Sequence, residues 1–323
     1  MADEQKIQAP TPNEQVDAER KPTPEEVEAA FTGKNRAHFE GLGDQWMVLT
    51  GQQPNYLIPQ VVGTVLHEGG SRPAWQWERK GQEHVVMAWP ADSPARAAVL
   101  MVGEKEGKLQ PKNAVPLLEG LPNDLTVDSV HPWQNGLGAN VSVSMLEDGN
   151  PMWFHDPLYG RDQDDLTPGV THTFVLSGLA FGVRKALLDE VTITQGPRYE
   201  AYAEAWLAEN PDKTRLQVPP LKVNVAGKRI IMPGRNFCEY QMRTAVEKIE
   251  DCQLEQMPIK VLYTQFPFDN RPPMILPIYV SKLTLGDLEP EVGMEIDAYV
   301  WLQGRIIDFD PQEQQDETQS DNA

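Results

Sequence analysis

A faint internal repeat in the second half of the chain is the feature that most constrains its fold. Residues 151–168 align without a gap to residues 273–290, and five of the eighteen aligned positions are identical. Each copy is followed by a glycine turn and an apolar run that ends in glycine, at Gly178 in the first copy and at Gly304 in the second. Two segments that are similar at a fixed spacing in the sequence indicate a repeated structural unit. The repeat therefore predicts two related small units, in which the two glycines mark bends where a strand ends.

The second copy shows its strands most clearly. Apolar runs bounded by turn residues predict strands at 238–247, 259–266, 274–280 and 294–302. In the last of these, apolar residues from Ile296 to Leu302 alternate with a second row formed by Glu295, Asp297, Tyr299 and Trp301. A long first strand, a hairpin, a short connection and a closing strand resemble the five-stranded OB fold. We therefore expect a mainly β protein with two tandem OB-like small antiparallel barrels, at 123–190 and 237–308.

A small β-rich domain at residues 41–122 is expected to precede the barrels. Short apolar runs, among them WMVLT, VVGTVL, WQW, HVVMAW and AAVLMV, are separated by Gly and Pro and predict strands. Trp75, Trp77 and Trp89 lie in this segment. They suit either an exposed binding platform or a packed core.

A bridging helix is predicted at 197–209, within a linker at 191–236. Its apolar residues recur at helical spacing and form one stripe: Tyr199, Tyr202, Ala203, Trp206 and Leu207. The stripe must be covered by other residues. The simplest expectation is that this helix is a clamp between the two barrels.

Both ends of the chain are polar and acidic. Residues 1–40 are expected to be a mobile acidic tail with a short helix at about 24–31, and residues 309–323 a disordered acidic tail. The short helix begins at a capping-box pattern, Thr23-Pro24-Glu25-Glu26. It suits either docking on its own domain or recognition of a partner.

Charge and composition narrow the class of protein. The formal net charge of −20 disfavours binding to duplex DNA. No apolar run is long enough to cross a membrane, and the N-terminus lacks a signal-peptide pattern, so we expect a cytoplasmic protein. The two cysteines, Cys238 and Cys252, suit buried free thiols or, alternatively, a redox pair.

Catalytic signatures are weak. The six histidines show no metal-binding spacing, and no phosphate-binding or dinucleotide-binding glycine loop occurs, so neither a metal nor a cofactor is predicted. The best acid–base or metal candidate is the pair His155 and Asp156, with His172 nearby after folding. The alternative is structural, because His172 falls in a core-facing row and Asp156 precedes a proline turn.

Tyr299 and Trp301 are the strongest binding candidates. They lie opposite the apolar row of the last strand, and aromatic residues displayed on an OB-like sheet stack on single-stranded bases. Lys260, Lys282 and Arg305 would then contact phosphates. Alternatively, the two rings pack against helix 197–209 or against the other barrel.

These observations favour a non-enzymatic cytoplasmic interaction or adaptor protein built from small β-barrels, with a basic protein partner. The alternative is a single-stranded nucleic-acid-binding protein that uses Tyr299 and Trp301. A metal- or histidine-dependent enzyme acting through His155 is the third candidate.

Overall fold

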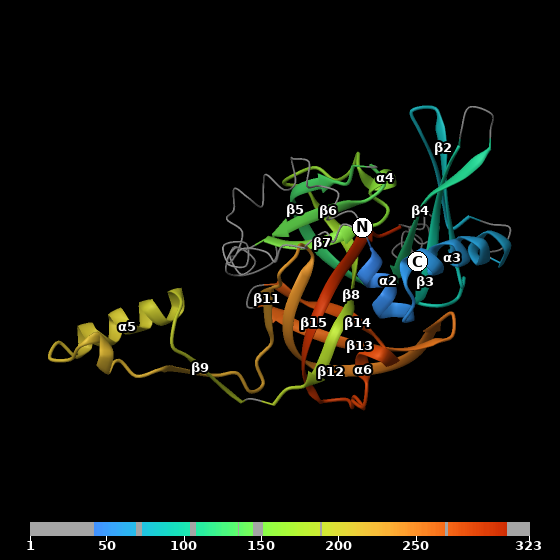
Figure 1. Cartoon of the computed structure of the whole chain (residues 1–323). Helices are drawn as coiled ribbons and strands as arrows, with labels where there is room; N and C mark the ends of the chain where they lie inside the picture. The colour runs from blue at the N-terminus through green and yellow to red at the C-terminus, as the bar shows by residue number, and fades with distance from the viewer. Residues whose placement is uncertain are drawn as a thin grey trace, which may run out of the picture. The chain divides into compact units, whose positions relative to one another are not determined.

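The structure is a computed structural model that describes residues 42–68, 73–103, 108–134, 136–144, 151–187, 189–268 and 271–308. These residues belong to one unit that begins at Leu42, and they are mainly β-strand (Figure 1). The mainly β class expected from the sequence is therefore confirmed. The short helix expected at about 24–31 and the acidic tails at 1–40 and 309–323 lie outside the described residues.

Two helices precede the first strand, where the sequence analysis expected strands. α2 spans Gly43–Thr50 and α3 spans Pro54–Glu68, so the strand prediction for WMVLT and VVGTVL is wrong. Leu57, Val61 and Val65 recur at every fourth position, and all three are buried. That spacing places them on one face of a helix. A short apolar run is compatible with both the helical and the strand period, so its sequence alone does not distinguish the two. In the structure this run is helical.

A four-stranded antiparallel sheet follows the helices. Its strands pair in chain order: β1 (Trp75–Arg79), β2 (Gln82–Trp89), β3 (Ala95–Gly103) and β4 (Leu109–Leu118). The β1–β2 hairpin turns through Lys80 and Gly81, both with positive φ, which suits the right-handed twist of paired strands. α3 packs against β2, β3 and β4, while β12 of the next sheet contacts β3. This explains why β3 is buried along nearly its whole length.

Eight long strands then pair into two closed rings. They are β5 (Leu121–Pro132), β6 (Ala139–Ser144), β7 (Pro151–Asp156), β8 (Thr171–Lys185), β12 (Glu239–Leu254), β13 (Met257–Phe268), β14 (Arg271–Ser281) and β15 (Glu295–Ile306). The first ring pairs β5, β6, β7, β15 and β8, and β8 returns to β5. The second ring pairs β12, β13, β14, β8 and β15, and β15 returns to β12. Short helices α4 (Tyr159–Asp162) and α6 (Lys282–Leu285) follow β7 and β14.

Both rings share β8 and β15, which run antiparallel along most of their length (Figure 1). Ser177 faces Gln303 near the middle of this pairing. A glycine faces a leucine on each side of that pair, with Gly178 opposite Leu302 and Gly304 opposite Leu176. The same arrangement of residue types thus occurs twice around one central pair.

The two glycines lie inside strands, not at the strand ends expected from the sequence. A Cβ atom at Gly178 would come within 2.5 Å of Cγ1 of Val300, and a Cβ atom at Gly304 within 2.6 Å of Cδ2 of Leu176. Glycine is therefore required by close packing where the strands pass from one ring to the other.

Alternate residues of the ring strands pack into two cores. The inner core lies among the ring strands and includes the row of β15 expected from its alternation: Ile296, Ala298, Val300 and Leu302. The outer core joins the opposite face of these strands, including Leu179, Tyr279 and Trp301, to the helices and the four-stranded sheet. Gln303 strengthens this contact, because its buried amide donates to the Pro116 carbonyl at 2.8 Å and accepts from the Leu118 N–H at 2.9 Å.

A segment between β8 and β11 (Ile230–Pro233) leaves the rings and returns to them. We call residues 186–229 the arm. β9 (Glu190–Ile193) and β10 (Leu221–Asn224) pair as its stalk. α5 (Pro197–Glu209) and the short 3₁₀ helix η3 (Arg215–Gln217) lie beyond that stalk (Figure 1). β11 then adds to the edge of β12.

The helix expected at 197–209 is present as α5, but the clamp between barrels is wrong. No extended contact joins α5 to a ring strand in the described part of the chain. Ala203 is fully buried within the arm, where the Tyr199 hydroxyl donates to the Val218 carbonyl at 3.4 Å. An apolar stripe indicates that one helix face is covered, but it does not identify the covering segment.

Candidate functional site

His155, which the sequence suggested as an acid–base candidate, is buried inside the protein. It is 1% exposed, and its ring lies between those of Trp133 and Trp301, with centroids 4.3 and 5.6 Å away. Neither ring nitrogen has a hydrogen-bond partner among the described residues. Burial is the largest cause that lowers the pKa of His155 to about 3, and the Ala139 backbone acts in the opposite direction. The imidazole is therefore neutral and has no direct access to a substrate.

Asp156 is also fully buried. Its Oδ1 accepts a hydrogen bond from the Leu158 N–H at 2.8 Å, and its Oδ2 has no partner among the described side chains and backbone. Burial, followed by the charge of Asp162, raises the pKa of Asp156 well above its usual range. His172 is half-buried on β8, with its ring beside Phe174. The geometry therefore shows no accessible acid–base pair at these positions.

Trp301 is 4% exposed and belongs to the outer core, so its ring is not displayed for stacking. The packing alternative describes this residue, because its ring lies 5.6 Å from that of His155 on β7 of the first ring and it belongs to the same core as residues of the helices and the four-stranded sheet. Tyr299 is half-buried on the same face of β15. Its hydroxyl donates to the Glu239 carboxylate and accepts from the Arg235 N–H at 3.2 Å.

The three candidate phosphate contacts lie on different elements, and each is paired with an acid. The ion pairs are Lys260 with Asp251 at 3.0 Å, Lys282 with Glu289 at 3.7 Å, and Arg305 with Glu119 at 3.0 Å and Asp308 at 3.2 Å. These cations do not form one basic surface beside Trp301.

The other tryptophan cluster is packed as well. Trp75, Trp77 and Trp89 are half-buried against the outer core. The Trp75 indole N–H donates to Asp308 at 2.8 Å, and Trp77 stacks on His84 with centroids 5.2 Å apart. The packed alternative therefore describes these rings better than an exposed platform does.

Both cysteines are free. Cys238 is buried, and its thiol donates to Oδ1 of Asn140 at 3.6 Å. Burial raises the pKa of Cys238 well above its usual range and that of Cys252 to about 11. Thiols with raised pKa values are poor nucleophiles, which favours the structural alternative.

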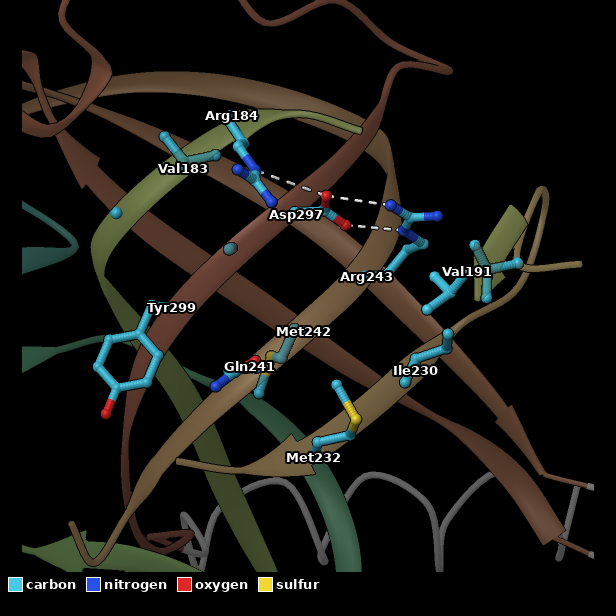
Figure 2. Close-up of a pocket in the computed structure, with 13 residues that line it drawn as sticks. Val183, Arg184, Val191, Ile230, Met232, Gln241, Met242, Arg243, Asp297 and Tyr299 are labelled. Carbon is cyan, nitrogen blue, oxygen red and sulfur yellow. Dashed lines mark hydrogen bonds and ion pairs between the residues drawn. The ribbon is translucent and has the colours of Figure 1, made fainter. Parts of the chain in front are cut away.

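A pocket of about 570 Å³ opens where the arm joins the second ring (Figure 2). Its floor is the outer surface of β8, β15 and β12, which lie side by side at the registers Arg184–Asp297 and Asp297–Arg243. Its wall comes from β11 and from the stalk of the arm. The volume falls within the range of small-molecule sites.

An aspartate between two arginines crosses the pocket floor. Asp297 accepts two hydrogen bonds from Arg243, Nε to Oδ1 at 2.7 Å and Nη2 to Oδ2 at 3.0 Å, and Nε of Arg184 lies 3.6 Å from Oδ2 (Figure 2). The Arg243 side chain is 9% exposed, whereas that of Arg184 is 71% exposed. Arg243 is thus held by Asp297, while Arg184 remains available to solvent.

The rest of the pocket is largely apolar. Val191 of the arm lines it together with Ile230 and Met232 of β11 (Figure 2), and Val225 of the arm is a further lining residue. Gly182 lies on the floor, and a Cβ atom there would meet no atom within 4 Å. Tyr299 and Gln241 supply polar groups away from the arginines (Figure 2).

Tyr299 was predicted from the sequence as a binding residue, whereas its pocket neighbours Arg184, Arg243 and Asp297 were not. The alternation of β15 puts Asp297 and Tyr299 on one face, and that signal was visible. Arg184 and Arg243 meet Asp297 only through pairings that join segments far apart in the chain. No local pattern reports those registers.

No protein-family model and no curated protein matches this chain. Among solved structures, this chain is similar to the cytoplasmic molybdate-binding protein ModG in a form with molybdate bound. The match has 13% identity and a TM-score of 0.24, and it covers 57% of this chain and 94% of that chain. Within the described residues, no group of three or more His, Cys, Asp and Glu side chains is arranged to hold a metal ion. No helix described here is long and apolar enough to cross a membrane.

Proposed function

We propose that this chain is a non-enzymatic cytoplasmic binding protein whose arm docks on a basic protein partner. Its scaffold is a pair of OB-like barrels, one per ring, that exchange β8 and β15. In support, each ring contains three consecutive antiparallel strands, a short helix and two shared strands, which is the composition of a five-stranded OB-like barrel.

The observation that carries the proposal is the exposure of aliphatic side chains on the arm. Leu216 is 99% exposed and Leu187 is 74% exposed. Isolated exposed apolar residues are common on protein surfaces. These two, however, lie on a segment whose helix makes no extended contact with the rings among the described residues. A segment of this kind suits docking better than it suits stabilising its own fold.

Charge on α5 favours a basic partner. Glu204 and Glu209 are exposed, and neither has an ion-pair partner among the described residues. Glu200 is paired with Arg215. Complementary charges steer association and select partners, so exposed carboxylates on α5 would attract a basic surface.

The alternatives have weaker support. A stacking platform needs an accessible Trp301 ring, and that ring is covered. A reaction through His155 and Asp156 needs solvent access, and both side chains are buried. Neither alternative has an observation of its own in its favour.

Site-specific photo-crosslinking tests the proposal. A photoreactive residue would replace Leu216 in the full chain, and a matched one would replace Val292, which is 67% exposed in the connection between α6 and β15. We expect the Leu216 probe to trap one basic protein that the Val292 probe does not trap. The purified trapped protein should bind the wild-type chain, with weaker binding at higher salt.

The variants Leu216→Asp and Glu204→Lys should each weaken that binding, whereas Val292→Asp should not. Equal trapping at both positions would contradict the proposal, as would trapping of a second copy of this chain. Unchanged binding by both arm variants would also contradict it.

A further inference from the structure

We propose that the pocket between the arm and the second ring binds a small organic molecule with an apolar body and one anionic group. This inference is separate from partner docking on α5, because it concerns the floor formed by β8, β15 and β12 and the wall formed by β11 and the arm stalk. Its elements are a cavity of about 570 Å³, an accessible arginine and an apolar wall.

Arg184 is the group that recognises the charge. Its side chain is 71% exposed, and its one contact with Asp297 is 3.6 Å long, which exceeds a normal hydrogen bond. The planar guanidinium has five N–H donors, so it can hold a carboxylate or sulfonate with two parallel bonds while it stays near Asp297.

The surrounding charges limit the ligand to a single negative group. Arg243 is engaged by Asp297, and the charges of Glu295 and Asp189 also act on it. The Glu295 carboxylate in turn accepts the Gly227 N–H at 2.8 Å. Among the described residues that line the pocket, Arg184 is the one available cation once the acids are counted, and they do not form a basic patch. A polyphosphate or nucleic-acid backbone would meet repulsion from the acids.

The apolar wall selects an organic body. Val191 and Val225 of the arm and Met232 of β11 line the pocket, and Gly182 leaves the floor bare directly beside Tyr299 in the strand register. A hydrocarbon body in this pocket would bury apolar surface against these side chains, which a hydrated inorganic ion cannot do. In the strand register Tyr299 is paired with Gly182 on one side and with Gln241 on the other.

Calorimetric titration of the full chain with a matched pair of probes tests the proposal. Naphthoate carries the charge and the apolar body, and naphthamide is nearly the same shape without the charge. Inorganic phosphate carries charge alone. We expect naphthoate to bind about tenfold more tightly than naphthamide, which is the usual value of one charge-assisted hydrogen-bond contact. Phosphate should not bind measurably and should not compete.

Variants place the binding in this pocket. Arg184→Gln should weaken naphthoate binding about tenfold and leave naphthamide unchanged. Lys185→Gln is the matched control, because it removes the same charge from the next residue of β8, which is exposed but does not line the pocket. Gly182→Leu should abolish binding of both probes by filling the floor. Val191→Trp fills the pocket from the arm stalk and replaces Gly182→Leu if that variant fails to fold.

Several results would overturn the inference. Equal affinity for the two naphthalene probes would show that the pocket does not recognise the charge. Competition by phosphate would show that the pocket does not require an apolar body. Binding that persists after both filling variants would place the ligand elsewhere. Absence of naphthoate binding to the wild-type chain would remove the site. None of these readouts depends on a protein partner, so they separate this inference from the proposed docking.

Discussion

Gly178 of β8 lies so close to Val300 of β15 that a Cβ atom at position 178 would be 2.5 Å from Cγ1 of Val300. Val300 is fully buried in the inner core and is paired on both sides, with Tyr240 of β12 and Ala180 of β8. It therefore has little room to move without opening a ring. The close pairing of the two shared strands therefore leaves no room for a side chain at position 178.

Adding one methyl group at this position should be strongly destabilising. We expect Gly178→Ala to lower the free energy of unfolding by about 1–3 kcal/mol, because an overpacked core must shift side chains or backbone. Gly304→Ala should have a similar effect, since its Cβ would lie 2.6 Å from Leu176 and 2.8 Å from Phe154. Urea unfolding followed by circular dichroism measures both.

Gly182 on the same strand is the matched control, because its Cβ would meet nothing within 4 Å. Gly182→Ala should leave stability unchanged or raise it by about 0.4–1 kcal/mol, since alanine reduces the entropy of the unfolded chain. Equal effects at 178 and 182 would show that strand propensity, and not the close contact, sets the glycine requirement.

The buried imidazole of His155 should make the protein sensitive to acid. The pKa of His155 falls from 6.5 to about 3 on folding, so the unfolded chain binds the extra proton as pH drops below 6.5. Stability from this group is therefore complete above the unfolded pKa and is lost on acidification. Proton linkage at this one group lowers the free energy of unfolding by about 2–3 kcal/mol between about pH 7.5 and about pH 4.5.

His155→Leu should remove most of that acid sensitivity and leave stability near neutral pH unchanged or higher, because it also removes two unpaired ring nitrogens. Asp156 has a raised pKa, which favours the folded state on acidification, but this effect is present in both proteins and cancels in the comparison. Urea unfolding at several pH values provides the data. His67→Leu, at an exposed site, controls for the loss of an imidazole. Parallel pH curves for wild type and His155→Leu would disprove the assignment.

The fold was predictable where local periodicity is strong. The alternation from Ile296 to Leu302 identified both the strand and its buried face, which the inner core confirms. The helical spacing of Leu57, Val61 and Val65 was equally present, but the run is short and was interpreted as a strand. Periodicity alone cannot separate these cases when an apolar run covers only two helical turns.

Contacts between segments far apart in the chain could not be predicted from local sequence patterns. The pairing of Ser177 with Gln303 joins residues more than a hundred positions apart, and it determines which strands belong to both rings. The same limit applies to the pocket, where Arg184 and Arg243 meet Asp297 from two other strands. A single sequence contains no signal for such registers, although it does show which face of β15 points outward.

The last prediction separates packing from nucleic-acid stacking at Trp301. The side chain is 4% exposed and lies beside His155 in the outer core, so truncation would leave a large cavity. We expect Trp301→Ala to lower the free energy of unfolding by about 3–5 kcal/mol. Trp206→Ala, which removes a half-buried tryptophan from the arm, should lower it much less.

A short single-stranded oligothymidine added to the wild-type protein should leave tryptophan fluorescence unchanged at low and at physiological salt. Stacking on bases would instead quench the fluorescence at low salt, and Trp301→Ala would lose about 1–3 kcal/mol of binding while the protein stayed folded. A buried ring cannot both pack in the core and stack on bases unless the protein opens locally. The unfolding and fluorescence measurements together therefore distinguish a packed Trp301 from a stacking Trp301. Salt-sensitive quenching that disappears in a stably folded Trp301→Ala protein would favour nucleic-acid binding over the packed role.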